Sequence, residues 1–189
     1  MSHITIISSS IRAGRKSHRL ALFFQKYLND NELATVEILD LASYNFPLFE
    51  MRLKYNNNPG LNVLEFKNKI ISSDGVLIVT PEYNGSIPAS LKNVIDLLYE
   101  EWQNKPIAIS TVSSGDFGGL QALAHLQFIL HKIGAKVSSF NYPVSRVHEK
   151  FDEWGTPAEK ESAEAFAKLF IDAFLELAEH NYVYSHQPQ

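Results

Sequence analysis

The chain of 189 residues has a mass of 21.4 kDa, with 45% hydrophobic and 20% charged residues, a balance typical of one globular domain rather than of a disordered chain. It contains no cysteine, which excludes disulfides, thiolate metal sites and cysteine nucleophiles. The formal net charge of −4 offers no basic footprint for nucleic acid or an anionic membrane. No apolar run approaches the roughly 20 residues that span a bilayer.

Strand-like and helix-like segments alternate along the chain. Apolar or β-branched runs predict strands at 3–8, 35–39, 75–79, 106–111 and 136–140. Helical spacing of apolar residues predicts helices at 19–29, 61–72, 88–99 and 120–133. Thr156-Pro157-Ala158-Glu159 has the spacing of a capping box and predicts a last helix that runs to about Glu179.

This alternation predicts one doubly wound α/β domain over residues 1–189, with a disordered tail at 181–189. Ligands of such domains bind beyond the carboxyl ends of the strands. We therefore expect the functional residues in the loops after the first, third and fourth strands.

The first of these loops, 8–18, joins a strand to a helix start, where unpaired N–H groups and the helix dipole attract anions. Serines 8–10 and the cations Arg12, Arg15 and Lys16 crowd this turn, which predicts a phosphate site. The spacing matches neither a P-loop nor a dinucleotide glycine pattern, so a lone phosphate fits best. The alternative is a solvated turn with Ser17 as the helix N-cap.

The loop after the third strand, 80–88, is restricted by two prolines. Asn84 and Gly85 accept unusual backbone dihedrals, and Tyr83 offers an aromatic face. Such a loop can present N–H groups to the edge of a flat heterocycle. A plain tight connection between strand and helix is the alternative.

The loop after the fourth strand, 113–119, carries three glycines that let a ligand approach the backbone closely. Glycine-rich turns are common in α/β proteins, so this loop alone does not indicate a ligand site. It supports one because it lies beside the other two loops. We predict a structural role for Asp40 after the second strand, a surface pair for Lys92 and Asp96, and no metal ligands among the histidines, whose spacings match no metal motif.

Three segments together resemble the NADPH-dependent FMN reductase family: 9–17, 81–96 and 114–119. The segment 81–96 is the most specific of them, and Ser9 departs from the family's usual glycine. The resemblance implies a flavodoxin-like fold, a five-stranded parallel sheet of order 2-1-3-4-5 with helices on both faces. It also implies FMN as cofactor, with Ser10, Arg12, Ser17 and His18 at its phosphate, Pro81, Glu82, Tyr83, Asn84 and Gly85 at the isoalloxazine ring, and Ser113, Ser114 and Gly115 flanking the flavin.

The same resemblance implies an NAD(P)H-dependent oxidoreductase that reduces a small acceptor such as a quinone, free flavin, azo dye or metal oxyanion. Hydride would pass through bound FMN by a ping-pong mechanism, with no side-chain catalytic residue. A flavodoxin-like electron carrier that serves a protein partner is the alternative, and a phosphate-sensing regulatory domain is a third. The cationic loop, the mild net charge and the segment 81–96 favour the reductase, with NADPH and NADH both open as donors.

The absence of cysteine is compatible with a reducing cytosol, and we expect a cytoplasmic protein. The family resemblance further implies a homodimer, or a dimer of dimers, with an interface that includes the helix from Pro88 to about Tyr99. Tyr83, Tyr99 and Trp102 are left over by the buried stripe of this helix, and aromatic residues are enriched at interfaces. The alternative is that these rings fold back onto the core of their own chain.

Overall fold

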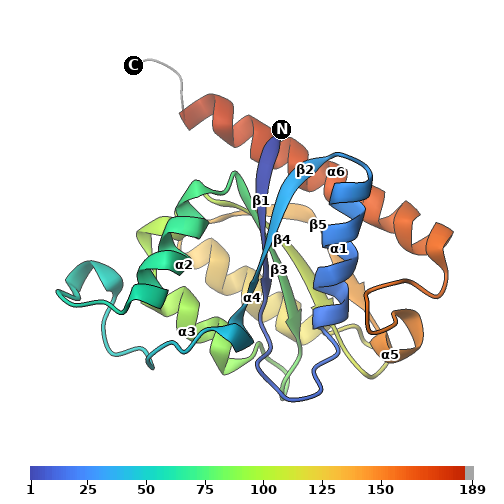
Figure 1. Ribbon diagram of the computed structural model, residues 1–189, viewed down its shortest axis with the longest axis horizontal. Helices are drawn as coiled ribbons and strands as arrows, with labels where there is room; N and C mark the ends of the chain where they lie inside the picture. Colours follow the sequence, from blue (N-terminus) through green and yellow to red (C-terminus); the bar gives the residue numbers. More distant parts are fainter. Residues whose placement is uncertain (186–189) are drawn as a thin grey trace.

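Five parallel strands form the centre of the computed structural model, which describes residues 1–185 and their side chains as far as Asn181 (Figure 1). The strands are β1 (Ser2–Ser8), β2 (Ala34–Asp40), β3 (Gly75–Pro81), β4 (Pro106–Val112) and β5 (Lys136–Val144). The helices are α1 (His18–Asp30), α2 (Leu61–Ser72), α3 (Ala89–Leu97), α4 (Leu120–Lys132), α5 (Val147–Lys150) and α6 (Lys160–Ser185), with 3₁₀ turns η1 (Leu41–Ser43), η2 (Leu53–Tyr55) and η3 (Glu100–Trp102).

The sheet order is β2-β1-β3-β4-β5, which confirms the predicted flavodoxin-like topology. At the end of β1, Ser8 pairs with Asp40 on one side and with Val79 on the other. The register shifts at the outer strand, where β5 advances from Val137 to Asn141 while β4 advances only from Ile107 to Ile109. The chain reverses its direction of winding at β1, so the crevice between β1 and β3 is the expected ligand position.

Helices cover both faces of the sheet, as predicted, because side chains alternate along each buried strand. Ile4 and Ile6 of β1 pack with residues of α1 and α6 on one face. Ile7 of β1 packs with residues of α2, α3 and α4 on the other. The two cores fix the strands rigidly and leave their carboxyl ends free, at the lower end of the sheet in Figure 1.

The end of α3 and the segment that follows it differ from the predicted helix at 88–99. The helix ends at Leu97, and η3 turns Trp102 inward until its side chain is fully buried in the core. Tyr99 lies under the Arg52 guanidinium, whose Cζ is 4.0 Å from the ring centroid. The expectation that Trp102 is left over for an interface was wrong, because the early helix end aims the ring at its own chain.

The predicted capping box at Thr156 was also wrong. Thr156 donates its N–H to Asp152 Oδ1 at 2.7 Å, and Pro157 forms an isolated bridge with Phe151, so α6 begins at Lys160. At its other end α6 continues past Glu179 to Ser185, and residues 186–189 of the predicted tail lie outside the described residues. No helix in the described part of the chain is both long and apolar enough to cross a membrane.

Candidate functional site

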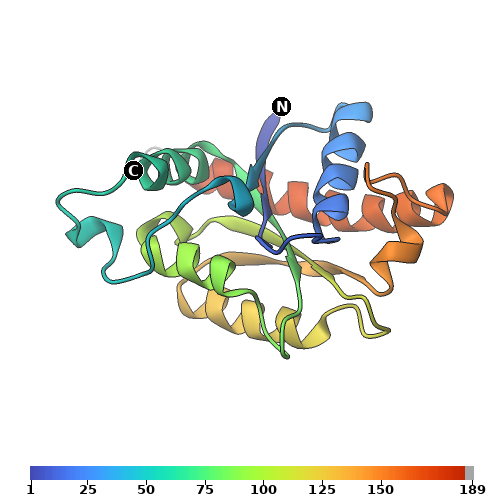
Figure 2. The ribbon, with the colours of Figure 1, turned by 60° about the horizontal axis from the view of Figure 1, so that its bottom comes forward.

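The three loops singled out in the sequence meet around one cavity of about 500 Å³ at the carboxyl ends of the strands, the end that Figure 2 turns toward the viewer. Its wall consists of the last residues of β3 and β4, residues from the loops after β1, β3 and β4, and one residue of α5. These residues are Arg12, Ala13, Gly14, Arg15, Lys16, Ser17, Pro81, Glu82, Tyr83, Val112, Ser113, Ser114, Gly115, Phe117, Gly119 and Val147.

The turn after β1 contains buried hydroxyls that suit a phosphate group. Ser17 immediately precedes α1, yet its side chain makes no capping bond with the helix. Its Oγ is buried and has no hydrogen-bond partner among the residues that the structure describes, while Ser17 itself lines the cavity. Leaving such a hydroxyl unpaired costs about 1–3 kcal/mol. A phosphate oxygen at this helix start would accept its hydrogen, so the residues present fit the phosphate of FMN.

The cations of this turn divide into two groups. Arg15 forms an ion pair with Asp40 and donates to the carbonyl oxygen of Ser10 at 2.6 Å, so its charge is matched within the protein and it ties the loop to the end of β2. Arg12 and Lys16 also line the cavity. They are therefore the cations that remain to balance the charge of an anionic ligand.

His18 lies behind this turn rather than on the cavity wall. Its Nδ1 is 2.9 Å from Ser8 Oγ and 3.9 Å from Asp40 Oδ2. Burial lowers the pKa of His18 below its ordinary value of 6.5; the Asp40 carboxylate opposes this shift and Arg15 adds to it. The imidazole is thus held in its neutral form as a structural partner of Ser8.

Because the folded-state pKa of His18 is lowered, the unfolded chain takes up its proton first as the pH falls. We expect the His18 contribution to stability to be complete above pH 6.5 and to be lost as the pH falls from there through the folded-state pKa. Urea unfolding at several pH values should show a steeper loss of stability between about pH 7.5 and 5 for the wild type than for His18→Asn. Equal slopes would show that the imidazole is not held neutral.

The loop after β3 folds into a tight turn at Tyr83–Ser86. Tyr83 and Ser86 exchange both backbone hydrogen bonds, at 2.8 and 3.0 Å. Asn84 and Gly85 have φ of 51° and 75°, the positive values that a type I′ turn requires. The expectation of unusual dihedrals at these two residues is confirmed. The Tyr83 hydroxyl reaches back to Ser10 Oγ at 2.6 Å, so this loop is bonded directly to the phosphate turn.

Glu82 links the same loop to the start of α4. Its Oε2 accepts the N–H groups of Gln121 and Ala122 at 3.0 and 3.2 Å. A carboxylate at this position satisfies orphan donors and complements the helix dipole. A Cβ on Gly85 would lie 2.6 Å from Gln121 Oε1, so the turn and the helix approach each other closely. The loops after β3 and β4 therefore form one rigid unit.

The hydroxyl of Ser113 holds the loop after β4 in place. Ser113 Oγ donates to the carbonyl of Gly115 at 2.8 Å and accepts the N–H of Gly118 at 3.0 Å. Gly119 has φ of 78°, and a Cβ there would lie 3.1 Å from Thr111 Cβ. The left-handed backbone conformation favours glycine at this position, and the tight contact with Thr111 adds to that preference.

Eight of the twelve predicted binding residues line the cavity: Arg12, Ser17, Pro81, Glu82, Tyr83, Ser113, Ser114 and Gly115. Ser10, His18, Asn84 and Gly85 lie beside it, where they hold Tyr83, Ser8 and the turn in place. Lys16, Phe117 and Val147 are wall residues that sequence reasoning did not assign. Lys16 belongs to the cationic run that predicted the phosphate site, but α5, which carries Val147, was not predicted at all.

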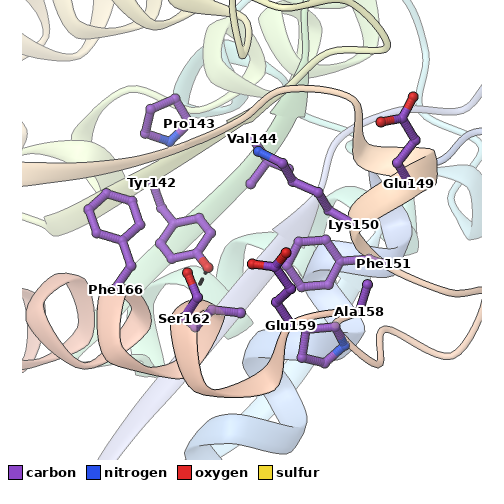
Figure 3. A pocket seen from close by; sticks show the side chains of 12 residues that line it. Tyr142, Pro143, Val144, Glu149, Lys150, Phe151, Ala158, Glu159, Ser162 and Phe166 are labelled. Carbon is purple, nitrogen blue, oxygen red and sulfur yellow. Dashed lines mark hydrogen bonds between the residues drawn. The ribbon is translucent and has the colours of Figure 1, made fainter.

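A second cavity, also of about 500 Å³, lies between the end of β5, α5 and the first turns of α6 (Figure 3). Tyr142, Phe151 and Phe166 supply aromatic side chains, with Glu149, Lys150 and Glu159 around them. None of the predicted site residues is among those that line it. The convergence of the loops after β1, β3 and β4 makes the first cavity the candidate site.

Comparison with known proteins points to the same chemistry. The sequence profile of the NADPH-dependent FMN reductase family matches residues 2–148. An NAD(P)H-dependent FMN reductase of Saccharomyces cerevisiae is 30% identical over 147 residues, 71% of this chain and 76% of that protein. A quinone reductase of Escherichia coli K12 is 37% identical over 109 residues, 55% and 58% of the two chains.

Among solved structures, FerB, a flavoenzyme NAD(P)H:(acceptor) oxidoreductase from Paracoccus denitrificans, superimposes with a TM-score of 0.78 and 27% identity. The match covers 96% of this chain and 99% of FerB, so the whole fold is shared. The family profile spans both the phosphate turn and the two loops that close the cavity. The chain therefore belongs to the NADPH-dependent FMN reductase family, whose members are oxidoreductases that use FMN and NAD(P)H.

Proposed function

We propose that the chain, as a single FMN-binding domain, passes electrons from NADPH or NADH through FMN to a small acceptor such as a quinone, free flavin, azo dye or metal oxyanion. The observation that carries the proposal is the shared cavity: a cationic, hydroxyl-rich turn and two rigid loops line the same space. Glu82 bonds the loop after β3 to the start of α4, which directly follows the loop after β4, so the space is formed before any ligand enters.

Within this cavity we propose that Arg12, Lys16 and Ser17 hold the phosphate, while the wall formed by Pro81–Tyr83 and Ser113–Gly115 holds the ring system. When bound, FMN would supply the two-electron chemistry that links the nicotinamide donor to the acceptor. The protein positions the reactants. The N–H groups of Glu82 and Tyr83 are already donated to Val112 and Ser86, so they serve the shape of the loop.

A visible spectrum tests the proposal directly. Protein reconstituted with FMN should retain the flavin after gel filtration, and its absorbance should bleach when NADPH is added without oxygen and return when a quinone is added. Failure to retain any FMN would contradict the proposal. Bound FMN that neither NADPH nor NADH bleaches would favour the flavodoxin-like electron carrier instead.

Steady-state kinetics tests the proposed ping-pong order. If donor and acceptor use one exposed face of the flavin in succession, double-reciprocal plots at several fixed acceptor concentrations should be parallel. The same plots with ferricyanide in place of the quinone give a control, because that acceptor needs no defined binding site. Intersecting lines with the quinone would indicate a ternary complex and contradict the shared face.

We also propose a cytoplasmic homodimer, or a dimer of dimers, that associates through the region of α3. Asn93 of α3 holds the loop between η1 and η2, since its side chain accepts from Phe49 N and donates to the Pro47 carbonyl at 2.8 and 2.9 Å. This loop displays Leu48 with 83% and Met51 with 46% of their surfaces exposed. Exposed apolar side chains on a loop that is fixed to α3 support association through this region.

Light scattering at micromolar concentration checks the assembly, and a mass of one chain would contradict it. If a dimer is found, Leu48→Asp should weaken it, because a charge would be buried at the contact. Ile71→Asp is the matched control, since Ile71 is 53% exposed on α2. Equal effects of the two changes would place the interface elsewhere.

A further inference from the structure

Phe117 is a cavity residue that the proposed function leaves without a role. Its side chain is 81% exposed, although it lines the same cavity as the phosphate turn and Tyr83. Single exposed aromatic residues are common on protein surfaces and need no explanation by themselves. Phe117 differs because its ring is presented at a concave site by a backbone that the surrounding residues fix.

The neighbours of Phe117 are anchored on both sides. Gly118 donates its N–H to Ser113 Oγ at 3.0 Å, and its carbonyl accepts the Thr111 hydroxyl at 2.7 Å. Asp116 forms an ion pair with Arg146, whose own N–H bonds the Gly115 carbonyl at 3.0 Å. These contacts fix the backbone on both sides of Phe117, so the direction in which its side chain leaves the loop is set by the fold.

The cavity also has two chemically different sides. Arg12 and Lys16 come from the loop after β1, whereas Phe117 comes from the loop after β4, with β3 and its loop between them. Val147 of α5 lines the cavity as a further apolar residue. A ligand with an anionic group on the β1 side would leave the aromatic side for another flat, uncharged partner.

We propose that Phe117 is a specificity-determining residue, whose ring forms a platform against which planar aromatic acceptors bind in preference to compact ions such as metal oxyanions. The inference rests on the proposed function, because it requires the flavin in this cavity. Planar acceptors gain offset stacking and burial of apolar surface against the ring. A compact hydrated ion gains neither.

Replacement of the ring separates these two classes of acceptor. Phe117→Ala should raise KM for 2-methyl-1,4-naphthoquinone about three- to tenfold, the range that one stacked aromatic pair supports, with little change in kcat. The rate with ferricyanide should stay unchanged. Phe117→Tyr should restore the wild-type KM because it keeps the aromatic face, whereas Phe117→Leu should restore it only in part.

An equilibrium measurement tests the platform without turnover. Calorimetric titration of the FMN-loaded protein with 2-naphthol should give a Kd that rises about three- to tenfold in Phe117→Ala. Phe128→Ala is the matched control, because Phe128 is 74% exposed on α4 and is not among the residues that line this cavity. It should leave both KM and Kd unchanged.

Three outcomes would overturn the inference, and they are distinguishable. If Phe117→Ala retains FMN and is bleached by NADPH but keeps the wild-type KM and Kd, the platform is wrong and the proposed function stands. If light scattering shows that Phe117→Ala has a lower mass than the wild type, the ring is a subunit contact instead. If the wild-type protein retains no FMN, the proposed function fails and this inference fails with it.

Discussion

Replacing Arg12 with alanine should raise the Kd for FMN by roughly 10- to 150-fold, which corresponds to about 1.5–3 kcal/mol for one lost charge-assisted hydrogen bond. The expectation rests on the division of charge in the turn after β1. Arg15 is neutralised by Asp40, whereas Arg12 lines the cavity and is exposed. Fluorescence titration of the protein with FMN measures the change.

Riboflavin, which lacks the phosphate, separates this effect from a general loss of structure. Its Kd should be the same for the wild type and Arg12→Ala, and weaker than that of FMN for the wild type. Arg52→Ala is a control of the same residue type, because Arg52 lies over the Tyr99 ring away from the cavity. An unchanged affinity of Arg12→Ala for FMN would show that Arg12 does not contact the phosphate.

Gly155→Ala should lower the free energy of unfolding by about 2–5 kcal/mol, the combined cost of a strained backbone and an overpacked contact. Gly155 has φ of 78°, and a Cβ there would lie 2.5 Å from the Arg19 carbonyl oxygen and 2.6 Å from Phe23 N of α1. Backbone atoms inside a helix cannot shift aside. Urea unfolding monitored by circular dichroism measures the loss.

Gly134→Ala separates the free-energy cost of the left-handed backbone conformation from the cost of the overpacked contact. Gly134 has φ of 84°, but the nearest atom to its Cβ position is Gln103 Cγ at 3.9 Å, so only the left-handed conformation is penalised, by about 1–2 kcal/mol. A loss for Gly155→Ala no larger than that for Gly134→Ala would contradict the close packing of the segment 151–159 against α1.

The sheet was predictable because its signals are local. Continuous apolar runs such as 75–79 belong to strands covered on both faces, and β3 spans Gly75–Pro81. The failures arose where tertiary contacts decide. Thr156 has the sequence of a cap but bonds to Asp152 instead, and the orientation of Trp102 depends on where α3 stops. Neither choice is written in the spacing of apolar residues.

The three loops that form the site could be predicted from the sequence. The individual contacts between their side chains could be predicted less well. Sequence order places 8–18, 80–88 and 113–119 at one edge of the sheet. The pairing of Arg15 with Asp40 joins residues 25 positions apart, and Glu82 caps a helix 39 positions away. Such pairs follow only from strand order and register, so the sequence predicts which side chains gather but not which of them neutralise each other.

The two edge strands of the sheet, β2 and β5, carry features that oppose aggregation. On β2, Glu37 forms an ion pair with Lys69 and lies 3.4 Å from His3 Nε2, and a charge on an edge strand opposes the addition of a further strand. On β5, the register against β4 shifts after Val137, and Pro143 has no N–H to donate, which makes the edge strand irregular. Neither edge offers a continuous template to another chain. Refolding at high concentration should therefore yield dispersed protein rather than β-rich precipitate.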